Sequence, residues 1–126
     1  SDLKDKCLKF RLDAVKSWVN ELVTIFYNNQ TKISAAFFYY PKMARRIFLQ
    51  NWAFWNIDLV RPMNYHHSYN EDTDWINFSV ENGINETKEK FDYYSGIFVG
   101  ALNPQKFKEA IIGSIDAGAN IIVFLV

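Results

Sequence analysis

The residues best suited to chemistry lie in one polar segment near the middle of the chain. Between residues 64 and 72 the sequence NYHHSYNED combines amides, tyrosines, two histidines and two carboxylates. An aromatic ring packs against the apolar face of a pyranose, while polar side chains hydrogen-bond its hydroxyls, and carboxyl groups serve as general acids and bases. This combination indicates a ligand-binding loop. It suits sugar recognition, although the same side chains could bind many other ligands.

Eight residues are candidates for function, and they follow the ends of predicted strands. We expect the catalytic carboxylates to be Glu71 and Asp72, and the substrate-binding residues to be Tyr39, Tyr40, Asn64, Tyr65, His66 and Tyr69. Each also has an ordinary structural explanation. Acidic residues before a helix stabilise its positive N-terminal dipole, paired histidines in a polar loop are commonly exposed to solvent, and buried tyrosine hydroxyls need partners in any case.

The composition excludes several classes of protein. At 126 residues the chain is one domain or a piece of one. Its 14 basic and 14 acidic residues cancel, so it lacks the basic excess that a nucleic-acid backbone requires. One cysteine and two histidines show no metal-site spacing, and we expect neither a metal nor another cofactor. No run of 18 apolar residues occurs, and we expect no membrane insertion.

Aromatic residues are unusually frequent. The chain has 11 Phe, 7 Tyr and 4 Trp, which make up 17% of it and exceed what a core of this size needs. We therefore expect some rings to face a ligand or a partner. Trp52 and Trp55 are better explained as packing anchors.

Apolar periodicity, capping residues and prolines predict four helices. Apolar residues recur every three or four positions from about residue 3 to residue 27, as in an amphipathic helix. The other three helices begin at Pro41, after the acidic segment Asn70–Asp74, and at Asn103-Pro104. We expect Gly83 to interrupt the third helix and Gly118 to end the fourth.

Four apolar segments between these helices predict strands over about residues 33–39, 57–65, 94–99 and 120–126. The last contains IIVFLV, an unbroken apolar run typical of a strand buried on both faces. Alternating helices and strands predict an α/β fold with parallel strands. The strands begin about 25 to 36 residues apart, against roughly 31 in a (β/α)8 barrel. We therefore predict four βα units, the content of half a TIM barrel, with residues 1–126 a single domain or a fragment of one.

Half a barrel would have uncovered strand edges and an apolar inner face. Such edges and faces associate readily with another sheet. We therefore expect the partner to be a missing half-barrel or a second copy of the chain, which would make a homodimer.

Two long segments, residues 37–76 and 93–119, resemble a known family. In order along the chain, the matching features are Trp52, Pro62-Met63-Asn64-Tyr65, Tyr69 and Asp74-Trp75-Ile76. This order is similar to that of the family-10-like glycoside hydrolases, TIM-barrel glycosidases common in gut Bacteroidetes. The resemblance covers most of the chain beyond residue 32. It implies the C-terminal half of a (β/α)8 hydrolase domain, an oligosaccharide or polysaccharide substrate, and an extracytoplasmic location in the periplasm or at the cell surface.

Catalysis is where the chain departs from this family. Glycoside hydrolysis ordinarily needs two carboxyl groups across the scissile bond, and here Glu71 and Asp72 share one loop with no carboxylate at the other strand ends. We therefore expect this chain to contribute substrate-binding loops and to be inactive alone. Two alternatives stay open: a non-catalytic glycan-binding or scaffold domain, and a flavodoxin-like module that binds a small ligand at a strand-order switch point.

Overall fold

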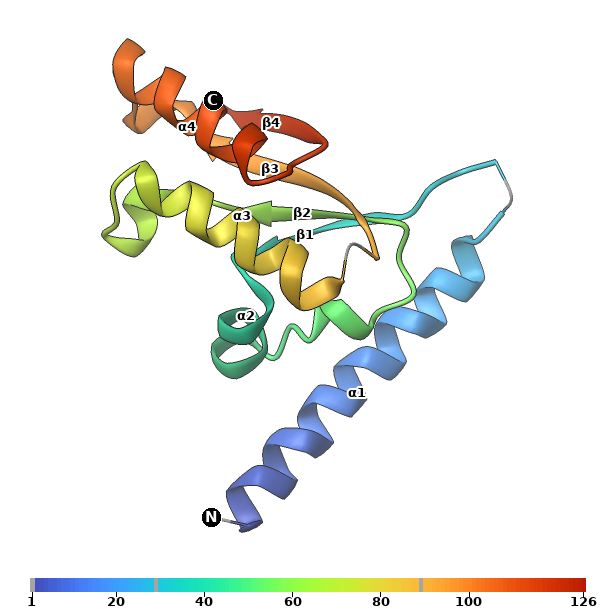
Figure 1. Cartoon of the computed structure of the whole chain (residues 1–126). Helices are drawn as coiled ribbons and strands as arrows, with labels where there is room; N and C mark the ends of the chain where they lie inside the picture. The colour runs from blue at the N-terminus through green and yellow to red at the C-terminus, as the bar shows by residue number, and fades with distance from the viewer. Residues whose placement is uncertain (1, 29, 89) are drawn as a thin grey trace.

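A computed structural model describes residues 2–28, 30–88 and 90–126. Helices and strands alternate along these residues (Figure 1). The helices are α1 (Asp2–Phe26), α2 (Pro41–Phe48), α3 (Asp74–Thr87) and α4 (Pro104–Asp116), and the strands are β1 (Ser34–Phe38), β2 (Leu59–Met63), β3 (Asp92–Phe98) and β4 (Ile121–Leu125). Short 3-10 helices are η1 (Trp52–Phe54), η2 (His66–Tyr69) and η3 (Val99–Ala101).

The four strands form one parallel sheet in the order β1-β2-β3-β4. This confirms the α/β class and the four βα units. Because parallel crossovers are right-handed and each strand lies beside the previous one, α2, α3 and α4 all cover the same face of the sheet. The strand order does not reverse, so this sheet lacks the switch point at which a doubly wound fold binds its ligand. The flavodoxin-like alternative is wrong on this point.

The apolar core lies between the sheet and its helices. Phe37 of β1 stacks on Trp52 with 5.4 Å between ring centroids and meets Trp55 edge-on at 5.2 Å. Both tryptophans are buried, as are Val60 of β2 and Ile97 of β3. The interpretation of Trp52 and Trp55 as packing anchors is therefore confirmed.

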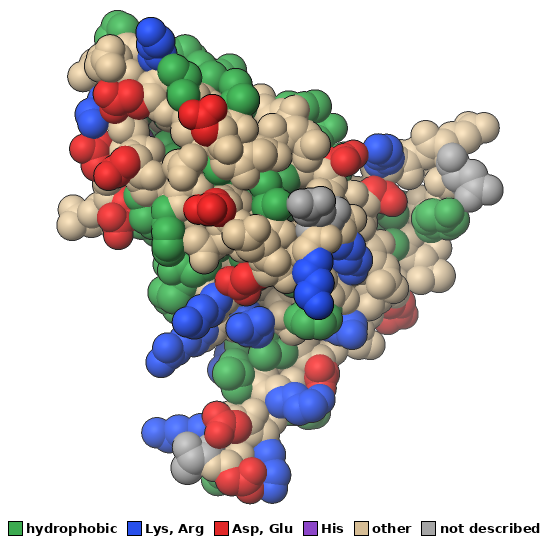
Figure 2. Space-filling view, in the orientation of Figure 1, with side chains coloured by type: hydrophobic (Ala, Val, Ile, Leu, Met, Phe, Trp, Pro, Cys, Tyr) green, Lys and Arg blue, Asp and Glu red, His purple; other side chains and the backbone are tan. Residues whose placement is uncertain are grey.

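The long helix α1 contacts the body of the protein along one side of its C-terminal half. Val15, Val19 and Val23 pack on the core, and the Asn20 side chain accepts a hydrogen bond from the Asn56 backbone N–H at 2.9 Å. The N-terminal half of the helix projects away from the sheet (Figure 1). In the same orientation, lysine and arginine side chains gather over α2, and acidic side chains over α3 and α4 (Figure 2).

Two expectations about the elements are wrong, and both concern tertiary packing. Gly83 does not interrupt α3; it lies inside the helix, where an added Cβ would come within 2.6 Å of the Tyr93 ring. Strand β4 is not buried on both faces, since Ile121 and Leu125 are each 46% exposed. On the other face α4 covers β4 only in part, because Phe107 lies 5.3 Å from the ring of Phe124 and Phe124 is itself 46% exposed.

The predicted ends of α4 are confirmed. The Asn103 side chain accepts a hydrogen bond from the Lys106 backbone N–H at 2.9 Å, as an N-cap does. At the other end, Gly118 follows the helix with a φ of +101°, a conformation that glycine adopts without steric cost.

Candidate functional site

The candidate residues lie beyond the carboxyl ends of the strands. Tyr39 and Tyr40 follow β1, and residues 64–72 follow β2. Parallel strands end at the same edge of a sheet, and in α/β proteins ligands bind at that edge. We call it the carboxyl edge. The structure brings residues from the first two loops into contact there.

Four aromatic residues at the carboxyl edge, Tyr39, Tyr40, Tyr69 and Trp75, form a group that we call the tyrosine cluster. The Tyr39 ring lies 4.2 Å from Tyr69, 5.2 Å from Tyr40 and 5.4 Å from Trp75, each measured between centroids. Tyr39 is buried, and the other three are half-buried. The sequence pattern predicts the three tyrosines as substrate-binding residues after strand ends, whereas it does not assign Trp75 a place among the binding residues.

The Tyr40 and Tyr69 hydroxyls stay protonated at neutral pH. Burial raises the pKa of Tyr69 to about 12. Burial also raises the pKa of Tyr40, with smaller contributions from Tyr39 and from the carboxylates of Glu86 and Glu71. These hydroxyls can therefore donate as well as accept hydrogen bonds, which is what recognition of a polyhydroxylated ligand requires.

A second group of rings at the carboxyl edge contains the two histidines. His67 is exposed and stacks on Phe98 at 4.7 Å, and Tyr65 lies 6.2 Å from the same ring. His66 is only 6% exposed, and its Nδ1 has no hydrogen-bond partner within the described residues. Burial lowers the pKa of His66, so its ring is neutral at pH 7. Paired histidines in a polar loop are commonly exposed, and here His67 is exposed whereas His66 is buried.

Asn64 differs from the other candidates because its side chain points into the interior. Its amide nitrogen donates to the Ser95 hydroxyl at 3.0 Å, and its oxygen accepts from the Ser79 hydroxyl at 2.7 Å. Ser95 in turn lies 2.9 Å from the Ser114 hydroxyl. All four residues are fully buried. Asn64 thus connects β2 to α3, β3 and α4, and the structure gives it a positioning role.

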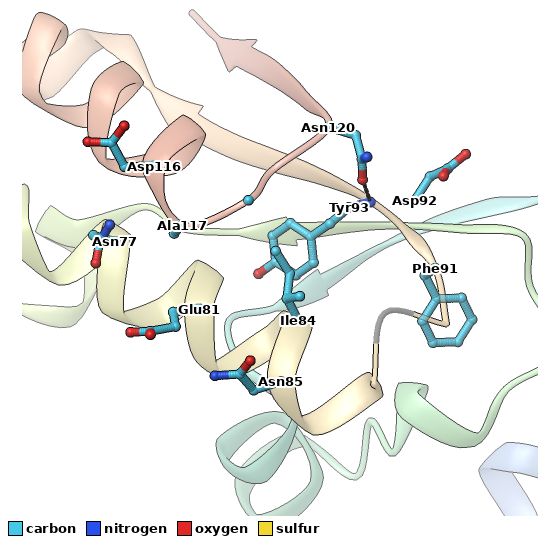
Figure 3. Close-up of a pocket in the computed structure, with 11 residues that line it drawn as sticks. Asn77, Glu81, Ile84, Asn85, Phe91, Asp92, Tyr93, Asp116, Ala117 and Asn120 are labelled. Carbon is cyan, nitrogen blue, oxygen red and sulfur yellow. Dashed lines mark hydrogen bonds between the residues drawn. The ribbon is translucent and has the colours of Figure 1, made fainter.

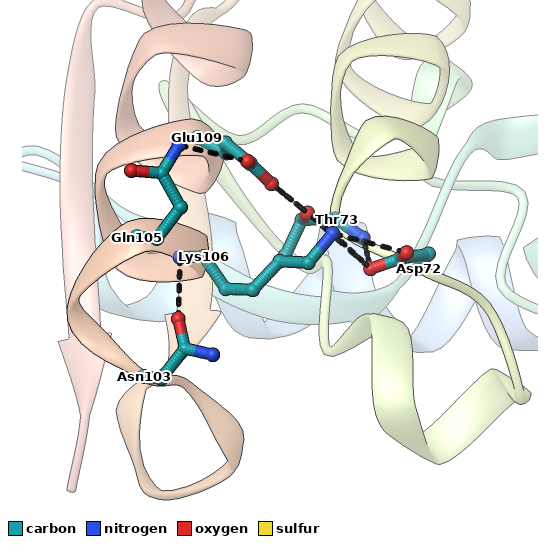
Figure 4. Close-up of polar contacts among 6 residues, drawn as sticks. All are labelled: Asp72, Thr73, Asn103, Gln105, Lys106 and Glu109. Atoms are coloured by element: carbon teal, nitrogen blue, oxygen red, sulfur yellow. Dashed lines mark hydrogen bonds and ion pairs between the residues drawn. The ribbon is translucent and has the colours of Figure 1, made fainter.

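Asp72 is held by a network at the first turn of α4 (Figure 4). Its carboxylate accepts a hydrogen bond from the Thr73 backbone N–H at 2.7 Å and lies 3.0 Å from the Lys106 ammonium. The Thr73 N–H, followed by Lys106, lowers the pKa of Asp72. The carboxylate is therefore ionised at neutral pH and cannot act as a proton donor there.

Lys106 and Glu109 also belong to this network, although neither is among the predicted site residues. Glu109 accepts a hydrogen bond from the Thr73 hydroxyl at 2.9 Å and lies 3.2 Å from the Lys106 ammonium. The Gln105 side chain, then Thr73 and Lys106, lower the pKa of Glu109. The predicted N-cap at Asn103 was the available signal, because it places the first turn of α4 at the carboxyl edge.

Glu71 stands apart from this network. Its backbone N–H donates to the His66 carbonyl at 3.0 Å, and its side chain is exposed. The carboxyl edge thus offers aromatic surface, protonated hydroxyls, a buried neutral imidazole, the ion-paired Asp72 and Glu109, and the exposed carboxylate of Glu71. Across residues 2–28, 30–88 and 90–126, no three His, Cys, Asp or Glu side chains are grouped so that they could hold a metal ion.

A groove of about 520 Å³ lies elsewhere, between α3 and α4 beside the start of β3 (Figure 3). Polar residues line much of it, among them Glu81, Asn85, Asp116 and Asn120. Asn120 accepts a hydrogen bond from the Tyr93 backbone N–H at 2.7 Å, which joins the groove to β3. None of the eight candidate residues lines this groove.

Comparison with models of protein families, with curated proteins and with solved structures finds no match to this chain. Of the helices that the structure describes, none is long and apolar enough to cross a membrane.

Proposed function

We propose that the carboxyl edge of this sheet binds carbohydrate, and that the chain is the C-terminal part of a glycoside hydrolase that cleaves O-glycosyl bonds outside the cytoplasm. The observation that supports the proposal is the tyrosine cluster. The half-buried rings of Tyr40, Tyr69 and Trp75 meet the buried Tyr39 there, and the Tyr40 and Tyr69 hydroxyls remain protonated. Rings of this kind pack against sugar faces, while hydroxyls and the nearby carboxylates bond sugar oxygens.

Within this proposal the chain contributes binding more than proton transfer. Asp72 is bound by Lys106 and is ionised, so it orients the loop between β2 and α3. Glu71 is the better candidate for acid–base work, because its exposed side chain lies outside that network. The second carboxyl group that hydrolysis requires comes from a partner half-barrel or from a second copy of the chain.

A non-catalytic glycan-binding domain is the second candidate. The observation in its favour is that Asp72 and Glu109, the carboxylates that the structure brings together, share one lysine and both have lowered pKa values. A pair held ionised in this way provides no general acid at neutral pH.

Calorimetric titration with a panel of cello-, xylo-, manno- and chito-oligosaccharides tests sugar binding. We expect Tyr40→Ala and Tyr69→Ala to weaken the binding of the sugar that the wild type prefers by at least about tenfold, or ~1.4 kcal/mol. Tyr27→Ala is the matched control, because Tyr27 is 62% exposed and follows α1. If no sugar binds, or if all three variants bind alike, the carboxyl edge is not a carbohydrate site.

An assay for new reducing ends with the same sugars separates binding from hydrolysis. We expect this chain to bind without cleaving. Cleavage by the chain alone, if Glu71→Gln abolished it, would instead show that Glu71 and a second group of this chain are sufficient for catalysis.

A further inference from the structure

The face of the sheet opposite α2, α3 and α4 is open over much of its centre and its β4 side, whereas Phe38 of β1 stacks on Phe48 at 3.5 Å between ring centroids and Leu59 of β2 is buried. Successive side chains of a strand point to opposite faces, so one set from each strand lies on this face. We call it the open face; its centre and its β4 side are formed by Ala36, Arg61, Tyr94, Ile121, Val123 and Leu125. Ala36, Arg61, Ile121 and Leu125 are exposed, and Tyr94 and Val123 are half-buried.

The two outer strands of the sheet also have edges that pair with no strand of the described residues, although on β1 the Phe38 backbone N–H donates to the Gln50 side chain at 2.9 Å. Within the described residues, no strand pairs with the outer side of β1 or of β4. Free edges readily pair with another strand. Four parallel strands with their helices on one side have the arrangement of half a closed eight-stranded barrel. A second sheet that paired with both edges would therefore cover the open face at the same time.

Arg61 determines what such a sheet must carry. It projects from the second of the four strands, between Ala36 and Tyr94, and its guanidinium carbon lies 5.8 Å from the centroid of the Tyr94 ring. Among the ion pairs of the described residues, none involves Arg61. Arginine stays charged in proteins, so covering this face without a counter-charge would bury an unpaired cation at a large energetic cost.

We propose that the open face docks a second parallel βα sheet that carries a carboxylate opposite Arg61. A carboxylate accepts two parallel hydrogen bonds from a guanidinium, and this pair would fix the register of the two sheets while apolar residues of β4 provide the surrounding contact. The proposal rests on one part of the proposed function, namely that this chain pairs with a second half-barrel. It does not depend on sugar binding.

An identical second copy meets this requirement poorly. A two-fold axis along the barrel would pair β4 of each copy with β1 of the other, and it would place the two β2 strands on opposite sides of the interior. The two Arg61 side chains would then face each other at the same height. Like charges in a closed interior repel strongly, so the occupant that we propose is acidic at this position.

Sedimentation equilibrium with wild type, with Arg61→Glu, and with an equimolar mixture tests the proposal. The Arg61→Glu copy serves as the probe, because it presents the same sheet with a carboxylate opposite the wild-type Arg61. We expect the mixture to associate at least about tenfold more tightly than either protein alone. Circular dichroism checks that the variant is folded, and Arg61 is exposed, so no core contact is removed.

Arg46→Glu provides the matched control, because Arg46 is exposed on α2 and its replacement changes the net charge equally. A mixture of wild type with Arg46→Glu should associate no more than wild type alone. The proposal is overturned if wild type alone associates as tightly as its mixture with Arg61→Glu, if that mixture does not associate, or if the Arg46→Glu mixture associates equally. The assay contains no sugar, so its failure leaves binding at the tyrosine cluster unaffected.

Discussion

At the end of β2, two neighbouring residues show how strand alternation separates structural from ligand-facing roles. The Asn64 side chain enters the helix layer and bonds Ser79 and Ser95, whereas the Tyr65 ring covers Gly96 on the opposite face. Both are plausible sugar-binding residues by type. Successive side chains point to opposite faces of the sheet, and this orientation, rather than side-chain chemistry, decides which of the two can contact a ligand.

Replacing Asn64 by alanine tests its structural role. The change removes the Asn64 partner of the buried Ser79 hydroxyl and one of the two partners of Ser95, which keeps Ser114, and an unpaired buried polar group costs about 1–3 kcal/mol. We expect Asn64→Ala to lower the free energy of unfolding, measured by urea denaturation, by roughly 2–4 kcal/mol. Asn82→Ala is the control, since among the described residues its side chain bonds the Phe78 carbonyl of its own helix alone. Equal stabilities of the two variants would contradict this role.

Helix α3 is shaped by its contact with β3 at Gly83. Alanine is favoured over glycine inside helices by about 1 kcal/mol, yet a Cβ at Gly83 would lie 2.6 Å from the fully buried Tyr93 ring. We expect Gly83→Ala to destabilise the protein by roughly 1–3 kcal/mol in thermal or urea unfolding. Gly113→Ala on α4 is the matched control, because its Cβ would meet Asn77 at an ordinary 3.5 Å. It should stabilise by up to about 1 kcal/mol, and the same sign for both variants would refute the close-packing explanation.

Elements that depend on local pattern are the ones the sequence predicts well. The Asn103-Pro104 cap, the Pro41 helix start and the four strands require only neighbouring residues, and the structure contains all of them. The reason for a glycine inside α3 is the Tyr93 ring, ten residues away in sequence, and so could not be predicted from a helix pattern. The exposure of β4 likewise depends on what covers each face of the sheet.

The same distinction explains the candidate site. The sequence places Tyr39 and Tyr69 in loops at the same edge, because parallel strands end at one edge. The connection between Asp72 and Lys106 could not be predicted in this way, because it requires the first turn of α4 to pack beside the loop that precedes α3. Spacing along the chain does not specify how two helices pack against each other.

The molecule as a whole is asymmetric in how it buries its aromatic residues. Trp52 and Trp55 are buried in the core, and Trp75 is half-buried in the tyrosine cluster. Trp18 and Phe10, both on α1, are each 75% exposed. Helix α1 therefore uses one side to reach the core through Val19 and Val23 and presents a second apolar side to solvent.

Iodide quenching of tryptophan fluorescence tests this orientation of α1. Iodide is charged and quenches only residues that water reaches, so most of the quenchable emission should come from Trp18. We expect Trp18→Phe to remove that component and Trp75→Phe to retain it. If α1 instead lay along the sheet in solution, or paired with another copy, Trp18 would be shielded and the two variants would quench alike. Repeating the measurement over a range of protein concentrations separates these cases, because only pairing between copies depends on concentration.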